Sequence, residues 1–233
     1  MSPVSASLFQ AREACYATAM IDVDDAARAV MEALSSGDPD RVDAARTAYL
    51  QVDGKGAVAA DMRYRLGLSR LFRHRDPDGA IELFKEAAAD KSAPVAPEAR
   101  VSLALCLSSR GKRQQAIFEL RKMLPEGAAA TIHTAQALDF LSMLLRDSGA
   151  AHKDVIAVDE TRKGHLRALA TDARDGLEKA HYLLRLAAAC ADGGTGIDFV
   201  SARKVYDEVI KLGAKAGESA LQAARQAQKS LPR

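Results

Sequence analysis

The chain has 233 residues, of which 48% are hydrophobic and only 5% aromatic, and its formal net charge is +2. The length allows one or two domains, and the hydrophobic content is sufficient for a packed core. A composition rich in Ala and poor in aromatic residues favours closely packed helices over a sheet. The nearly balanced charge argues against a polyanion-binding protein, so nucleic acid is an unlikely partner.

The N-terminal residues, MSPVSASLFQ, lack the basic and apolar regions of a signal peptide. No uncharged apolar stretch reaches the roughly 18 residues of a transmembrane helix, so we expect no membrane insertion. Three widely spaced cysteines, Cys15, Cys106 and Cys190, are an odd number and lie in helical Ala/Leu-rich windows. We expect buried, reduced thiols and a cytoplasmic location.

Residues 1–56 predict three helices that cap an array or form a degenerate repeat. Asp22 and Gly37 bound the second helix, and Asp-Pro at positions 38 and 39 is a start signal for the third. The expected helices are residues 5–20, 23–36 and 39–52.

A repeated unit occupies residues 57–128. Each copy has a helix with Leu beside a small residue, a turn, and a second helix that opens with Ala. Equivalent positions lie 36 residues apart in the pairs Ala80 and Ala116, Phe84 and Leu120, Ala87 and Met123. This spacing predicts repeated antiparallel helix pairs.

These two units resemble the tetratricopeptide repeat, a helix-turn-helix unit of 34 residues. Leu66-Gly67 and Leu103-Ala104 stand at the Leu-Gly pair of that family, and Ala80 and Ala116 stand at its small residue. The small residues let the two helices approach, and a large apolar residue fills the remaining space. The chain departs from the family in having no Trp.

The remaining residues, 129–233, predict divergent repeats and a C-terminal cap helix. Ala202, Tyr206 and Val209 repeat the spacing of the second helix of a unit. Asp172 is expected to cap a helix that ends near Ala191. The expected helices are residues 131–147, 152–169, 172–191, 199–212 and a last helix over ESALQAARQAQKS.

The resemblance implies an all-α, right-handed superhelical solenoid of about ten to eleven helices in a single domain over residues 1–233. It also implies a non-enzymatic scaffold or adaptor that binds a partner peptide or protein in a concave groove. The open ends of such an array allow self-association. The groove positions that the resemblance assigns are Tyr64, Leu68, Leu71 and Phe72 in the first unit and Val101 and Leu105 in the second.

A cluster of arginines on the first unit, with His74 beside it, offers two interpretations. It is a solvated face, or it binds an acidic peptide, because Arg pairs with carboxylates bidentately. The four arginines assigned to the partner site are Arg63, Arg65, Arg70 and Arg73.

No phosphate loop, GxSxG, HExxH or CxxC motif is present, so we expect no catalytic residues, no cofactor and no metal. The alternative is an enzyme or ligand-binding sensor with a site between the repeat core and the divergent C-terminal helices, near His165 and His181. An enzyme is expected to show a buried polar cluster with perturbed pKa values, whereas a groove binder is expected to show exposed apolar side chains.

Overall fold

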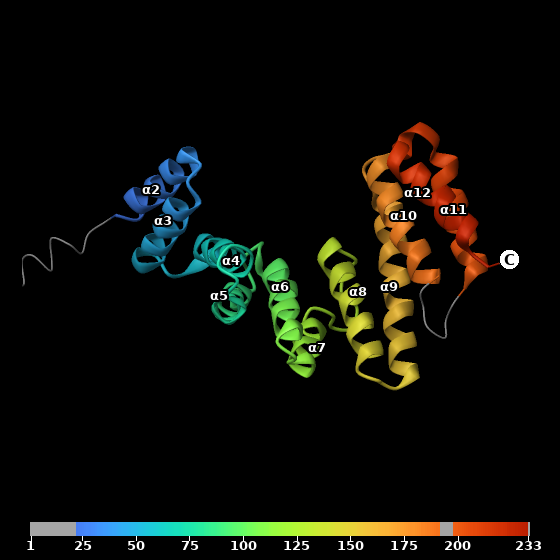
Figure 1. Ribbon diagram of the computed structural model, residues 1–233, viewed down its shortest axis with the longest axis horizontal. Helices are drawn as coiled ribbons and strands as arrows, with labels where there is room; N and C mark the ends of the chain where they lie inside the picture. Colours follow the sequence, from blue (N-terminus) through green and yellow to red (C-terminus); the bar gives the residue numbers. More distant parts are fainter. Residues whose placement is uncertain (1–21, 192–197, 233) are drawn as a thin grey trace, which may run out of the picture. The chain divides into compact units, whose positions relative to one another are not determined.

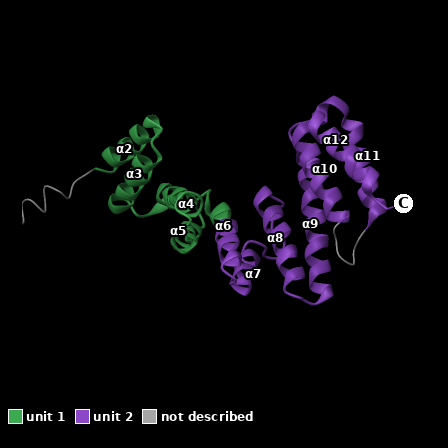
Figure 2. Ribbon diagram, in the orientation of Figure 1, with its two compact units in different colours: residues 1–99 green, residues 100–233 purple. Residues whose placement is uncertain are grey.

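The computed structural model describes residues 22–191 and 198–232, and these residues form helices without any strand (Figure 1). The predicted helix over residues 5–20 and Cys15 lie outside the described residues. The chain divides into two compact units, residues 1–99 and residues 100–233 (Figure 2), and the division falls within a helix. The sequence predicts one domain over residues 1–233. The division into two units does not test whether the units form one domain, so this stays a prediction.

The first unit contains α2 (Val23–Ser36), α3 (Pro39–Val52), α4 (Gly56–Phe72), α5 (Pro77–Ala89) and the start of α6 (Ala96–Ser109). Both Asp-Pro signals begin helices as predicted. The Asp38 carboxylate accepts hydrogen bonds from the backbone N–H groups of Asp40 and Arg41, and Asp76 accepts one from Gly79. Each Asp therefore satisfies donors that the first helical turn leaves free.

The α4–α5 pair shows why the repeat pattern needs a small residue. Phe84 is fully buried, and a Cβ atom on Gly67 would lie 2.6 Å from its Cε1 atom. The Tyr64 ring packs on the same side chain, with 5.7 Å between ring centroids. Ala80 and Ala87 are also fully buried, so the predicted motif positions form the contact between the two helices.

The second unit continues with α7 (Arg113–Arg121), α8 (Ile132–Asp147), α9 (His152–Asp172), α10 (Gly176–Ala191), α11 (Phe199–Leu212), the 3₁₀ turn η2 (Gly213–Ala216) and α12 (Glu218–Ser230). The prediction that Asp172 caps α10 is wrong, because α9 continues through that residue. Asp175 takes the role instead, and its carboxylate accepts a hydrogen bond from the backbone N–H of Glu178 at 2.8 Å. The repeat motif residues Ala104, Ala116 and Leu120 are fully buried.

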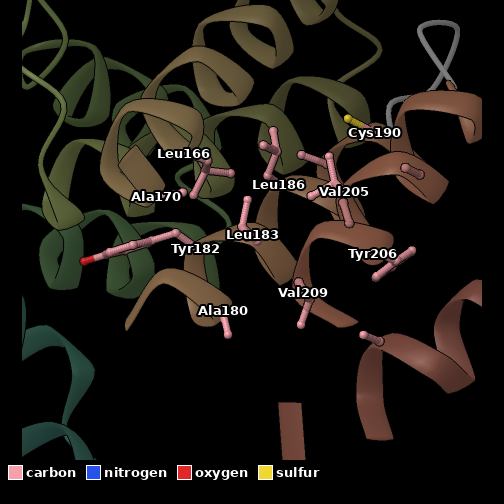
Figure 3. Packing of buried hydrophobic residues seen from close by; sticks show 14 of the residues in the cluster. Leu166, Ala170, Ala180, Tyr182, Leu183, Leu186, Cys190, Val205, Tyr206 and Val209 are labelled. Carbon is pink, nitrogen blue, oxygen red and sulfur yellow. The ribbon is translucent and has the colours of Figure 1, made fainter. Parts of the chain in front are cut away.

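An extensive apolar core lies in the second unit, mainly between α9, α10 and α11, and it also includes residues of α8 and α12. Figure 3 shows Leu183 and Leu186 of α10 between Leu166 of α9 and Val205 of α11. Cys190 belongs to this core, and Cys106 is buried elsewhere in the unit. Burial raises the pKa of both thiols, which makes them unreactive apolar packing groups.

Candidate partner-binding groove

The apolar positions assigned on α4 differ in exposure. Phe72 is 73% exposed, whereas Leu68 and Leu71 are half-buried. Tyr64 is also half-buried, since its ring packs against Phe84 in the helix pair. Phe72 is therefore the side chain of this set that offers substantial apolar surface to a partner.

Arg63 and Arg65 both form ion pairs with carboxylates of the first unit. Arg63 Nε lies 2.6 Å from a Glu86 carboxylate oxygen and the same side chain donates to the Gly54 carbonyl at 2.8 Å. Arg65 Nε pairs with Asp61 at 2.6 Å. An acidic peptide would have to compete with these carboxylates.

Arg73 is held in the same way by α3. Its guanidinium lies 2.6 Å from Asp40 and 3.1 Å from Asp43, and Asp43 also accepts a hydrogen bond from Ser69. Arg70 approaches Asp76 at 3.9 Å. The cluster is thus a set of local ion pairs, each of which stabilises an exposed surface by about 1 kcal/mol or less.

Val101 and Leu105 lie on α6 in the second unit. Val101 is half-buried, and Leu105 is 48% exposed. These two positions lie in the second unit and the α4 positions in the first, so each set is described by itself and the groove assigned to them stays a prediction.

The second unit contains a cavity of about 700 Å³, and its lining includes His181, one of the two histidines of the alternative hypothesis. It lies where α8, α10 and α12 begin, and we call it the α8–α10–α12 groove. Its exposed apolar side chains include Leu177, at 62%, and Ile132, at 38%. The residues that line it are Ile132, Arg174, Asp175, Leu177, Glu178, His181, Tyr182, Leu184, Ser219, Ala220 and Ala223.

The N-terminal caps of α8 and α10 fix the backbone that carries Ile132 and Leu177, the two large exposed apolar residues of the groove. A capping box begins α8: Thr131 accepts a hydrogen bond from the Thr134 backbone N–H, and the Thr134 hydroxyl accepts one from the Thr131 N–H. Ile132 is the first residue after this cap. Asp175 caps α10 by accepting a hydrogen bond from the Glu178 backbone N–H, so Leu177 lies on the first turn of a capped helix.

The polar edge of the groove is internally hydrogen-bonded. One Glu178 carboxylate oxygen accepts from the Arg174 backbone N–H at 2.9 Å, and the other accepts from the Tyr182 hydroxyl at 3.4 Å. Burial, together with the Glu178 charge, raises the pKa of Tyr182. A phenol with a raised pKa is neutral near pH 7, so the Tyr182 hydroxyl at this edge is a hydrogen-bonding group.

The two histidines of the alternative hypothesis have different surroundings. His181 is exposed at the groove and lies edge-on to Tyr182, with 5.6 Å between ring centroids. His165 Nδ1 lies 3.1 Å from the Thr134 hydroxyl, and burial lowers its pKa. Among the described residues, no group of three His, Cys, Asp or Glu side chains is placed to hold a metal ion.

A charged network with the buried Asp159 at its centre joins α8, α9 and α10, and no sequence motif pointed to it. Asp159 is 3% exposed and accepts hydrogen bonds from Ser142 at 2.5 Å and Arg146 at 2.7 Å. Asp139 on α8 contacts both Arg162 and Arg185. The many charged residues of α9 were the sequence feature that could have indicated this network.

No helix in the described part of the chain combines the length and apolar character needed to span a membrane. No protein-family model matches the sequence, and no curated protein matches it significantly.

Three solved structures share the fold at low sequence identity. A putative kinesin light chain of Podosopora anserina with nearly identical TPR-like repeats is 13% identical, with a TM-score of 0.54 over 85% of this chain and 100% of that chain. PilW, a type IV pilus biogenesis factor, is 15% identical, with a TM-score of 0.52 over 86% and 82%. A MamA protein is 16% identical, with a TM-score of 0.51 over 91% and 97%. The predicted all-α repeat architecture is thereby confirmed, and the chain has a tetratricopeptide-like fold.

Proposed function

We propose that this chain is a non-enzymatic scaffold that binds a protein partner through the α8–α10–α12 groove. The observation that carries the proposal is the position of Leu177, a large apolar side chain that is 62% exposed in a cavity of about 700 Å³. Three separate helices contribute side chains to that cavity.

The binding mechanism is preorganisation. Thr131 and Asp175 cap the helices that carry Ile132 and Leu177, so the backbone that presents these side chains is already ordered before a partner arrives. A partner that covers Leu177 removes apolar surface from water, and complete burial of such a side chain stabilises a complex by about 1.5–3 kcal/mol. A bulky aliphatic or aromatic side chain of the partner fits this site.

A ligand-binding sensor is the second candidate, and the cavity volume favours it. Small-molecule sites commonly enclose about 300–1,000 Å³, and His181 with the Tyr182–Glu178 pair supplies polar groups at one edge. Native mass spectrometry of the purified chain separates the two candidates. A small molecule that is retained by the wild type and lost from Leu177→Glu would support the sensor.

The scaffold proposal is tested by affinity capture with four versions of the full chain. Leu177→Glu places a charge in the groove. Val200→Glu is the matched control, because Val200 on α11 is 64% exposed outside the groove. Phe72→Glu tests the surface on α4 that the sequence favoured.

We expect the wild type, Val200→Glu and Phe72→Glu to capture a common partner that Leu177→Glu fails to capture. Circular dichroism should show equal helix content in all four proteins. Capture by Leu177→Glu at the wild-type level would reject the groove, and selective loss with Phe72→Glu would return the site to α4.

A further inference from the structure

Helix α12 forms one wall of the groove through Ser219, Ala220 and Ala223, which lie near its first turn. Its other end is hydrogen-bonded to α11. Arg203 donates to the Leu231 carbonyl at 3.0 Å, and Gln228 donates to the Asp207 carboxylate at 2.7 Å. These bonds fix the C-terminal end of α12 and leave the position of its groove-lining end to other contacts.

The groove-lining end is held against α10 through η2. A Cβ atom on Gly176 would lie 2.6 Å from the Lys215 carbonyl oxygen and 2.9 Å from its carbonyl carbon. These are backbone atoms, which cannot rotate out of the way as a side chain can. Gly176 has no positive φ angle, so its backbone conformation suits alanine and only the contact with η2 excludes a side chain.

The turn η2 has a second anchor beside this contact. Ala216 is fully buried in the core of the unit. Gly217, the residue between η2 and α12, approaches the groove residue Leu177, since a Cβ atom there would lie 3.2 Å from Leu177 Cδ1. The position of η2 on α10 therefore contributes to where α12 begins relative to Leu177, together with Leu221 and Ala224 of α12, which are buried in the same core.

We propose that Gly176 is a positioning residue for the partner site, because the close approach of η2 to it sets the distance between the α10 and α12 walls of the groove. This inference rests on the groove proposed above. A side chain at position 176 displaces η2 and the start of α12, and it changes the groove without touching the partner.

The test compares Gly176→Ala with Gly164→Ala in the full chain. Gly164 is also a helical glycine without positive φ, and a Cβ atom there meets nothing within 4 Å. Hydrogen exchange should become at least tenfold faster over residues 213–230 in Gly176→Ala and stay unchanged in α8. Gly164→Ala should match the wild type in both regions.

A milder variant, Ala216→Gly, guards against a Gly176→Ala protein that fails to fold. It removes the buried methyl group that anchors η2 without introducing a clash, and it should also raise exchange in α12. Exchange over residues 213–230 that stays at the wild-type rate in both variants would overturn the inference.

Binding of the apolar dye anilinonaphthalene sulfonate separates this inference from the groove itself. We expect Leu177→Ser to weaken dye binding and Gly176→Ala to change the dye dissociation constant at least threefold. An unchanged constant in Gly176→Ala, with weaker binding in Leu177→Ser, would reject the positioning role and keep the groove. An unchanged dye dissociation constant in Leu177→Ser would reject the groove. The hydrogen-exchange rates over residues 213–230 would then test only whether Gly176 positions η2 and α12.

Discussion

Two helix pairs of this chain are held together by different physical means. In the first unit, α4 and α5 meet through Gly67 and the fully buried Phe84. In the second unit, α8 and α9 meet around the buried carboxylate of Asp159, which Ser142 and Arg146 satisfy. A hairpin of two helices thus tolerates either close apolar packing or a satisfied charged network at its centre, and only the first of these leaves a repeat pattern in the sequence.

Removing the large side chain from the apolar pair should have the largest effect. Phe84→Ala should lower the free energy of unfolding by about 3–5 kcal/mol, because it leaves a cavity where a fully buried ring stood. Phe72→Ala, at a position that is 73% exposed, should change stability by less than about 0.5 kcal/mol. Urea unfolding followed by circular dichroism measures both, and similar losses would contradict the described packing.

Removing the buried carboxylate between α8 and α9 should lower the free energy of unfolding slightly less than Phe84→Ala does. Asp159→Ala leaves Arg146 without its buried partner, which should destabilise the unit by about 3 kcal/mol. The value lies at the lower end of the usual range because the Arg146 side chain is 30% exposed and regains water. Urea unfolding at two salt concentrations measures the loss.

An apolar replacement of the same network sharpens the comparison. The triple variant Ser142→Ala/Arg146→Leu/Asp159→Leu should be within about 1 kcal/mol of the wild type or more stable, since buried ion pairs seldom exceed well-packed apolar groups in stability. A triple variant that loses as much stability as Asp159→Ala would show that the network is indispensable.

Crowding the apolar pair should have an intermediate effect. Gly67→Ala brings a methyl group against Phe84 and should lower the free energy of unfolding by about 1–3 kcal/mol. Gly164→Ala on α9, which meets open space, should raise it by up to about 1 kcal/mol. In Phe84→Leu the cost of Gly67→Ala should shrink, and a double-mutant cycle without coupling would contradict the contact.

The smallest effect concerns His165 beside the capping box of α8. Burial lowers its folded-state pKa below the ordinary value of 6.5, so the folded chain favours the neutral ring. Its contribution to stability is present above pH 6.5 and is lost as the pH falls through the lower folded-state pKa. His165→Gln should flatten this dependence slightly, measured as thermal unfolding between pH 5 and 8. If the thermal stability of His165→Gln depends on pH as that of the wild type does, groups other than His165 cause the dependence.

The sequence predicted the helices well because their start and stop signals are local. Asp38 and Asp76 precede proline and cap their helices as expected, and Gly37 ends α2 in a left-handed conformation. The Asp172 error arose because two Asp residues stand close together, at 172 and 175, and only the tertiary structure shows which one begins the next helix.

The site was less predictable because a groove depends on side chains from distant segments. Ile132, Leu177 and Ala220 meet through packing that no local pattern encodes. The arginines of α4 were conspicuous in the sequence, but their partners include Asp40, Asp43 and Glu86 on neighbouring helices. These ion pairs fit the first of the two interpretations of the cluster, a solvated face, and the acidic-peptide interpretation stays a prediction.

Site-specific photo-crosslinking tests the proposed groove most directly. A photoreactive phenylalanine analogue would replace Leu177, Val200 or Phe72 in turn, three positions that are 62%, 64% and 73% exposed. The groove predicts a partner adduct from position 177 and none from positions 200 and 72. Adducts from position 72 without any from position 177 would contradict it.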